Sequence, residues 1–219
     1  MTKGINESVF DALASGRYAF LDLGSGSGGS IDHCVRRFGM SPGLGLEFDS
    51  GLVAEGRRAG FDVHQADVTC VEAPARSVRF VSMMDFLEHL PDEATATGVI
   101  ERLGPVARDF LFIRHPSFEE TEYLASLGLK LCWTDWTGHP NRMTIADFRR
   151  AFARLGWADY LILPQHRIAD SSHAQVVGLD APRDIVEYDE HLDGPKPLVV
   201  FDREIYTQFD IFVRLNPLM

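Results

Sequence analysis

A glycine-rich turn between an apolar run and a helical pattern is the feature that most constrains this chain. Residues 20–30 read FLDLGSGSGGS, so a short apolar run ends where glycine begins to recur at every second position. Residues 30–38 then carry apolar side chains at 31, 34, 35 and 38, the spacing of an amphipathic helix. Glycine adopts backbone angles that other residues avoid, and a bare turn lets a ligand approach the backbone. The stretch therefore predicts a nucleotide-type cradle, in which amide groups and the helix dipole face the ligand.

Apolar runs that suit buried strands alternate with helical patterns along most of the chain. Strands are expected over 18–23, 43–49, 61–68, 78–84, 110–116, 160–168 and 207–215. Helices are expected over 5–14, 30–38, 50–59, 118–127 and 145–155, and one more follows residues 85–92 and ends at about residue 103. This alternation implies right-handed crossovers in a parallel sheet. Thr144 is expected to cap the helix that begins at residue 145, and Pro164 to interrupt the sixth strand.

Two segments lack the alternating pattern. Residues 116–143 include an irregular aromatic stretch, which we interpret as a lid or substrate wall beside a strand end. Residues 169–206 are rich in Asp and Pro and form an insertion between the last two strands, too long for a tight hairpin. The chain of 219 residues thus predicts one α/β domain over 1–219, with a lid-like segment and an insertion.

The composition argues against several kinds of partner. The formal net charge of −11 disfavours a broad nucleic-acid surface, which needs clustered lysine and arginine. Cys34, Cys70 and Cys132 show neither a disulfide framework nor a CxxC metal pattern, which indicates a reducing, cytoplasmic setting. Neither a signal peptide nor a membrane span is expected. We expect a monomer or homodimer that acts on a small molecule.

The glycine motif alone does not identify the nucleotide. Gly24, Gly26 and Gly29 satisfy GxGxxG, and Glu47 lies near the position of a ribose-binding acid. An NAD-dependent oxidoreductase therefore remains an alternative. A protein that binds its cofactor without turnover is another.

Four further features favour a different cofactor. Asp22 lies in the strand end, Gly28 completes GxGxG, Asp67-Val68 ends the third strand, and residues 84–91 read MDFLEHLP. Together these residues resemble the class I S-adenosylmethionine-dependent methyltransferases over roughly residues 18–168, and the last strand agrees. The resemblance implies a doubly wound, Rossmann-like α/β fold. Its seven-stranded, mostly parallel sheet would have the order 3-2-1-4-5-7-6, with strand 7 antiparallel and the ligand at the carboxyl ends.

The resemblance also implies cofactor roles. The loop around Asp22, Gly24, Ser25 and Gly26 would pass the methionine end of S-adenosyl-L-methionine, and of the product S-adenosyl-L-homocysteine. The remaining roles fall on Glu47 for the ribose hydroxyls, Phe48 for the adenine face, Asp67 and Val68 for the adenine edge, and Met83 and Met84 for the methionine moiety. Because strand side chains alternate, one of the two methionines is expected in the core.

The acceptor is predicted from histidines and aromatic residues. Methyl transfer from a sulfonium is an in-line displacement, and a hydroxyl acceptor benefits from a base, for which histidine is the usual residue. The candidate bases at the ligand side of the sheet are His89, His115 and His139, and the candidate substrate contacts are Trp133, Trp136 and Arg142.

Residues 84–91 bear on the acceptor in two further ways. His89, within Glu-His-Leu-Pro, resembles the family's small-molecule O-methyltransferases. The sequence Asp85-Phe86-Leu87 lacks the (Asp/Asn)-Pro-Pro-(Tyr/Phe) pattern of the family's adenine, cytosine-amino and glutamine-amide N-methyltransferases. Glu88 and His89 could ligate a divalent cation, but two residues do not make a site, so we predict no metal. Methylation of a small-molecule hydroxyl is thus the predicted activity.

Overall fold

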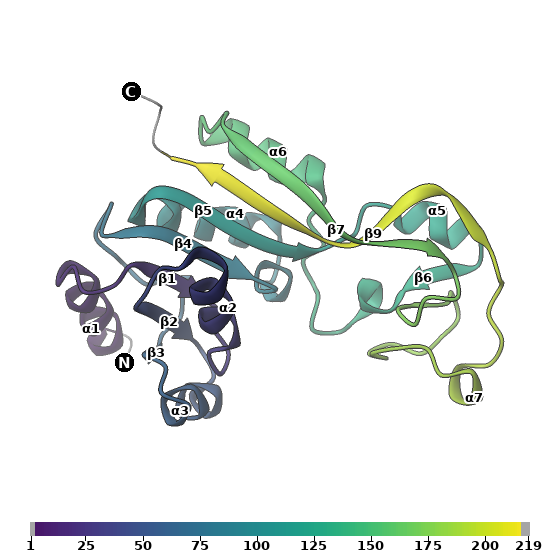
Figure 1. Cartoon of the computed structure of the whole chain (residues 1–219), viewed down its shortest axis with the longest axis horizontal. Coiled ribbons are helices and arrows are strands. Elements are labelled where there is room, and N and C mark those ends of the chain that lie inside the picture. Colours follow the sequence, from purple (N-terminus) through teal and green to yellow (C-terminus); the bar gives the residue numbers. More distant parts are fainter. Residues whose placement is uncertain (1–2, 216–219) are drawn as a thin grey trace.

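The computed structural model describes residues 3–215 and is built on one seven-stranded sheet (Figure 1). Its strands are β1 (Phe20–Leu23), β2 (Gly43–Glu47), β3 (Val63–Gln65), β4 (Val78–Met84), β5 (Ala107–Pro116), β7 (Tyr160–Asp170) and β9 (Val200–Arg214). The order is β3-β2-β1-β4-β5-β9-β7. Strands β1 to β5 pair in parallel, while β9 is antiparallel to both β5 and β7. Because β7 and β9 are the sixth and seventh predicted strands, the predicted order 3-2-1-4-5-7-6 is confirmed.

Helices cover both faces of this sheet. They are α1 (Lys3–Ala14), α2 (Gly29–Phe38), α3 (Ser50–Arg58), α4 (Glu93–Leu103) and α6 (Ile145–Arg154). Buried residues of α2 and α3 belong to one core, and those of α1, α4 and α6 belong to the core on the opposite face. The first core is aromatic: Phe20 and Phe80 stack at 4.7 Å between ring centroids, and Phe38 of α2 lies edge-on to Phe80 at 5.0 Å. Within the described residues, none of the helices has the length and apolar character needed to cross a bilayer.

Three strand predictions were wrong in detail. β3 is limited to Val63–Gln65, and β9 begins at residue 200 rather than 207. Pro164 does not interrupt β7, where it pairs with Phe209. β7 is the edge strand of the sheet, so a proline there can direct its nitrogen, which has no hydrogen to donate, away from the ladder.

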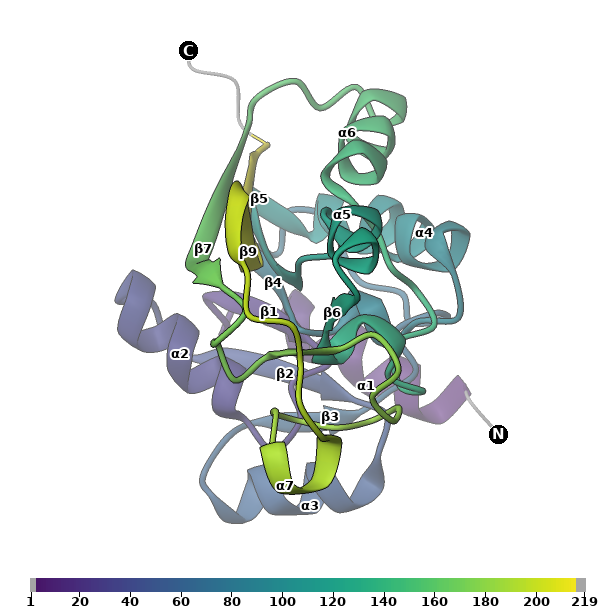
Figure 2. The ribbon, with the colours of Figure 1, turned by 90° about the vertical axis from the view of Figure 1, so that its right-hand side faces the viewer.

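The lid-like segment and the insertion share a single core. We call the residues around this core the outer lobe, which consists of 118–136 and 168–205. β6 (Leu129–Leu131) pairs with β8 (Val176–Gly178) in a small second sheet, and the helices are α5 (Thr121–Ser126) and α7 (Glu190–Asp193). The outer lobe lies beyond the carboxyl ends of β4 and β5, and Figure 2 views it end-on. The two irregular segments therefore form one body.

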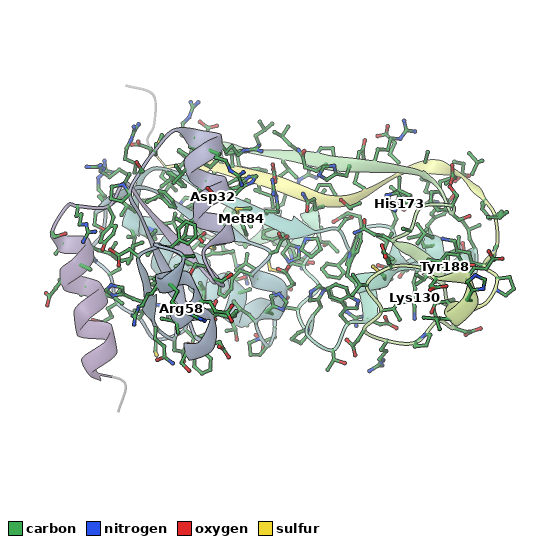
Figure 3. All side chains as sticks on the ribbon, turned by 60° about the horizontal axis from the view of Figure 1, so that its bottom comes forward. Asp32, Arg58, Met84, Lys130, His173 and Tyr188 are labelled. Carbon is green, nitrogen blue, oxygen red and sulfur yellow. The ribbon has the colours of Figure 1, made fainter. Side chains whose placement is uncertain are left out.

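Two lysines, Lys130 and Lys196, hold the outer lobe together. Lys130 of β6, only 7% exposed, donates to Asp135 at 2.8 Å and to the carbonyl of Ala181. Lys196 donates to the carbonyl of His173 at 3.0 Å and lies 3.9 Å from the ring centroid of Tyr188. Lys130, His173 and Tyr188 mark this lobe in Figure 3. Each lysine joins stretches of the lobe that are far apart in sequence.

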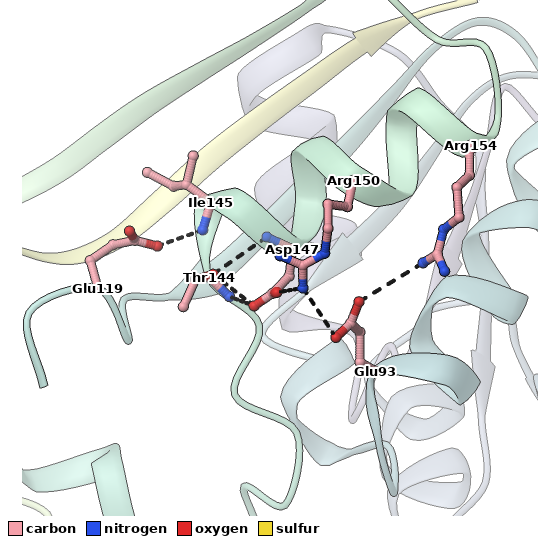
Figure 4. Close-up of polar contacts among 7 residues, drawn as sticks. All are labelled: Glu93, Glu119, Thr144, Ile145, Asp147, Arg150 and Arg154. Carbon is pink, nitrogen blue, oxygen red and sulfur yellow. Dashed lines mark hydrogen bonds and ion pairs between the residues drawn. The ribbon is translucent and has the colours of Figure 1, made fainter.

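The start of α6 connects the outer lobe to the sheet (Figure 4). The Thr144 side chain accepts from the Asp147 backbone, and the Asp147 carboxylate accepts from the Thr144 backbone at 2.7 Å, which together form a capping box. The carboxylate of Glu119, which follows β5, accepts from the backbone nitrogen of Ile145. The prediction that Thr144 caps this helix is confirmed.

We predict that Thr144→Ala lowers the free energy of unfolding by about 1 kcal/mol, because an N–H of the first helical turn loses its acceptor. Urea denaturation followed by circular dichroism measures this change. Thr144→Ser keeps the hydroxyl and should unfold close to the unsubstituted protein. An alanine variant as stable as the serine variant would contradict the capping role.

Candidate active site

A cavity of about 530 Å³ opens at the carboxyl ends of β1, β2, β3 and β4. Ligands of open parallel sheets bind at this edge, where the loops that follow the strands diverge. The residues that line the cavity are Gly24, Gly26, Leu46, Glu47, Phe48, Leu52, Ala66, Asp67, Val68, Thr69, Asp85, Phe86, His89 and Leu90. Six predicted cofactor residues are among them, and so is one predicted base, His89. We call the end of the cavity at His89 the histidine end.

The glycine loop has the conformation that its sequence predicts. Gly24 and Gly26 have φ values of 68° and 53°, which favour glycine. A Cβ at Gly24 would lie 2.2 Å from the ring of Phe86, whereas a Cβ at Gly26 would meet no atom within 4 Å. Gly24 is thus required by packing, and the position of Gly26 faces open space.

Asp22 supports the glycine loop through hydrogen bonds but does not line the cavity. Its carboxylate is fully buried and accepts hydrogen bonds from Ser30 of α2 and from Ser82 of β4, the latter at 2.6 Å. Burial raises the pKa of Asp22 to about 6, although both serines act in the opposite direction. Ser25 is also buried and outside the lining. The predicted contacts of Asp22 and Ser25 with the methionine end of the cofactor therefore stay predictions.

Glu47 joins the end of β2 to the glycine loop. One carboxylate oxygen accepts from the Gly26 nitrogen at 2.9 Å, and the other accepts from the nitrogens of Phe48 and Asp49 at 2.8 and 2.9 Å. A carboxylate has about four acceptor positions, so one remains for a ligand in the cavity.

The predicted adenine contacts Phe48, Asp67 and Val68 all line the cavity. The Phe48 side chain is 73% exposed, which leaves a ring face for a ligand to cover. Asp67 accepts from the Thr69 nitrogen at 2.9 Å and from its hydroxyl at 2.7 Å. Burial raises the pKa of Asp67, but these hydrogen bonds outweigh it and lower the pKa overall. The carboxylate is therefore ionised at neutral pH.

Met83 and Met84 belong to the two cores on opposite faces of the sheet, as strand alternation requires. Met84, marked in Figure 3, has its sulfur 3.9 Å from that of Cys34. Neither methionine lines the cavity. Their predicted contact with the cofactor has no support from this geometry.

The structure brings the three predicted bases into one region. The ring centroids of His89 and His139 are 5.0 Å apart, and the ring of Phe118 has its centroid 6.2 Å from that of His139 and 5.6 Å from that of His115. Each Nδ1 lies near a backbone carbonyl: that of Gly138 for His89 at 2.7 Å, that of Trp133 for His139 at 3.2 Å, and that of Pro116 for His115 at 2.8 Å. Of the three, only His89 lines the cavity.

Burial changes the protonation of this region. His115 is 1% exposed, and burial lowers its pKa to about 4. Burial also lowers the pKa of His139. Glu88 is likewise 1% exposed, and burial raises its pKa to about 8. From the sequence, Glu88 can be paired only with the adjacent His89, because His139 approaches them through a loop with no periodic signal.

The predicted substrate residues have different surroundings. Trp133 is buried and donates to the Ser117 carbonyl at 2.9 Å, and Trp136 donates to the Ile185 carbonyl at 2.7 Å. Both indoles pack in the core of the outer lobe. Arg142 is exposed on the segment that follows His139. Of the three, Trp133 is buried, Trp136 is half-buried and only Arg142 is exposed.

Comparison with solved structures identifies this architecture, whereas the sequence matches no protein-family model and no curated protein. A SAM-dependent methyltransferase from Archaeoglobus fulgidus superposes with a TM-score of 0.61 at 14% identity, covering 95% of this chain and 94% of that one. The chain has the class I methyltransferase fold.

Two further structures with the methyltransferase fold are similar over almost the whole chain. The magnesium protoporphyrin IX methyltransferase of Synechocystis, with bound SAH, has a TM-score of 0.54 at 14% identity over 97% of this chain and 82% of its own. An S-adenosylmethionine-dependent methyltransferase from Mesorhizobium loti has a TM-score of 0.53 at 17% identity over 93% and 96%. At such identities the likeness establishes the fold, so activity must be argued from the site.

Acidification should destabilise the protein through His115. Its pKa is about 4 in the folded state, against about 6.5 in an unfolded chain. Its contribution is therefore fully present above about pH 6.5 and is lost as the pH falls towards 4. Between pH 7 and pH 5 the loss from this residue amounts to about 2 kcal/mol.

The comparison that isolates this effect is His115→Gln, which cannot titrate and keeps a donor for the Pro116 carbonyl. Denaturant unfolding at the two pH values should show a smaller loss for this variant than for the unsubstituted protein. His191→Gln, at an exposed histidine of α7, should lose as much as the unsubstituted protein. Equal losses in all three proteins would refute the role of His115.

Proposed function

We propose that this protein transfers a methyl group from S-adenosyl-L-methionine to a hydroxyl of a small-molecule acceptor. The observation that carries the proposal is the composition of one cavity, in which Gly26, Glu47 and Asp67 meet at the carboxyl ends of three neighbouring strands. The methyltransferase fold supports the same conclusion. A volume of about 530 Å³ is in the range of small-molecule sites.

The cavity residues suit an adenosine cofactor in a definite order. The remaining acceptor position of Glu47 suits a ribose hydroxyl, and Asp67 and the exposed Phe48 ring suit the amino edge and face of adenine. Gly26 leaves room beside the loop for the methionine part. The reactive methyl group would then lie towards the histidine end.

When bound, S-adenosylmethionine supplies a methyl group on a sulfonium. The acceptor oxygen forms the new C–O bond, the electron pair of the broken C–S bond stays on sulfur, and the hydroxyl proton leaves to a base or to solvent. The chain's own part is to align the reactants and exclude water. Glu88 and His139 are almost fully buried beside His89, so these two side chains at the histidine end have almost no contact with water.

The acceptor class follows from charge and size. The net charge of −11 disfavours nucleic acid, and a cavity of about 530 Å³ suits a small molecule. We also propose a cytoplasmic location, because no disulfide joins the described cysteines, and a monomer or homodimer. Arg142 is the proposed contact for an anionic group of the substrate.

Ligand binding separates this proposal from an NAD-dependent oxidoreductase. S-adenosylhomocysteine should raise the melting temperature, because a ligand that binds only the folded state stabilises it, whereas NAD should have no effect. The reverse pattern would refute the proposal. Turnover of labelled S-adenosylmethionine with metabolite extracts then distinguishes an enzyme from a protein that only retains the cofactor.

Glu47→Ala should weaken S-adenosylhomocysteine binding about 10- to 100-fold, because hydrogen bonds from the ribose to a charged acceptor are lost. Isothermal titration calorimetry measures the affinity. Glu55→Ala, on the exposed side of α3, is the matched control and should bind like the unsubstituted protein. Unchanged affinity in Glu47→Ala would place the ribose contact elsewhere.

A further inference from the structure

Three potential metal ligands meet at the histidine end of the cavity. Glu88, His89 and His139 each offer one donor atom, and these atoms all lie within 4.8 Å of one another. We propose that Glu88, His89 and His139 bind a divalent first-row transition-metal ion. Metal binding stands on these residues alone, while its use in methyl transfer rests on the proposed function.

Both histidines are oriented as metal ligands usually are. A backbone carbonyl can only accept, so the short contacts to the carbonyls of Gly138 and Trp133 place the ring proton on Nδ1 of His89 and His139. Each Nε2 then carries a lone pair. Ligating histidines commonly donate their second nitrogen to a carbonyl or carboxylate, which fixes the ring and its tautomer.

Glu88 provides an independent observation. Its side chain is 1% exposed, and its Oε2 has no hydrogen-bond partner among the described residues. A buried carboxylate without a partner is costly, and proteins pair such a group or let it coordinate a metal. Asp85, which lines the cavity beside His89, adds negative charge, whereas Arg142 near His139 opposes it.

The two segments that carry the ligands are tied to each other by Asn141. The nitrogen of this buried residue donates to the carbonyl of Glu88 at 3.2 Å, and its side chain donates to the carbonyl of Leu87 at 2.9 Å. With the His89–Gly138 contact, three hydrogen bonds hold segment 138–141 against the turn η1 (Leu87–His89). The ligands are therefore brought together before any ion binds.

The donor set selects the class of metal. Two imidazole nitrogens and one carboxylate oxygen suit Zn²⁺, Co²⁺, Mn²⁺ or Fe²⁺, whereas Mg²⁺ and Ca²⁺ prefer oxygen ligands. With bonds of about 2.0–2.2 Å, a tetrahedral ion holds two donors about 3.3–3.6 Å apart, so donors at the 4.8 Å limit would move together by about 1.2–1.5 Å on binding.

Three protein ligands leave coordination positions open, as catalytic metal sites do. Because His89 lines the cavity, an ion held here would lie beside the space that we propose for the acceptor hydroxyl. A metal-bound hydroxyl loses its proton more readily than a free one. The ligand histidines would then activate the acceptor through the ion rather than act as free bases.

The test is metal binding to chelator-treated protein without cofactor. All samples carry Cys70→Ser, because Cys70 is an exposed thiol that could bind metal by itself. Calorimetric titration should show one Zn²⁺ per chain, with no binding of Mg²⁺. Glu88→Gln and His139→Gln should each weaken Zn²⁺ binding at least about 10-fold. The matched control His191→Gln, in α7, should not change it.

Failure to bind Zn²⁺, or ligand variants that bind it like the control, would overturn the inference. Should a variant not fold, the X-ray absorption spectrum of the zinc-loaded Cys70→Ser protein decides, because it should show two imidazole ligands and the absence of imidazole would refute the site. S-adenosylhomocysteine binding is measured separately on the metal-free protein. Cofactor binding without Zn²⁺ binding refutes only the metal site, and the opposite result refutes only the proposed function.

Discussion

The cavity depends on the hydrogen bonds that the buried carboxylate of Asp22 accepts. This carboxylate joins three elements, because it lies in β1 and accepts from Ser82 of β4 and from Ser30 at the start of α2. The glycine loop runs between β1 and α2, so both of its ends are fixed by one side chain. Burying a carboxylate is costly, and the two hydroxyl groups offset that cost. Glu47 then fixes the middle of the loop through Gly26.

A second set of contacts fixes the opposite end of the cavity by different means. Here backbone carbonyls and the Asn141 side chain connect the turn after β4 to a loop some fifty residues later. The buried groups at this end include a glutamate and two histidines, His139 and His115, whose pKa values are displaced by desolvation. Perturbed groups of this kind concentrate at functional sites, where burial is retained in spite of its cost.

The strands and the residues at the glycine-loop end of the cavity could be predicted from the sequence, because both depend on local patterns, whereas the sheet order came from the family resemblance. Apolar periodicity marks the strands, and the positions of Gly24, Gly26, Glu47 and Asp67 follow from where each strand ends. The predicted limits of β3 and β9 were wrong because pairing with neighbouring strands, rather than residue propensity, determines where a strand begins and ends.

The histidine end could be predicted only as a set of candidates. His139 reaches Glu88 through an irregular loop, and no period in the sequence relates positions 50 residues apart. The predictions for Met83 and Met84 came from the family resemblance, but alternation places their side chains in opposite cores. Trp133 and Trp136 fill the outer lobe for a similar reason: an aromatic stretch contains no signal that separates a substrate wall from a core.

The separate core of the outer lobe has a consequence for how this fold diversifies. The outer lobe consists of two segments, one between β5 and α6 and one between β7 and β9, and its apolar residues pack mainly on one another. Substitutions inside it can therefore reshape the wall beyond His139 while the packing around the glycine loop stays the same. The outer lobe and the sheet are in this sense separately evolvable, and a graft of the lobe between relatives would need four junctions, one at each end of its two segments.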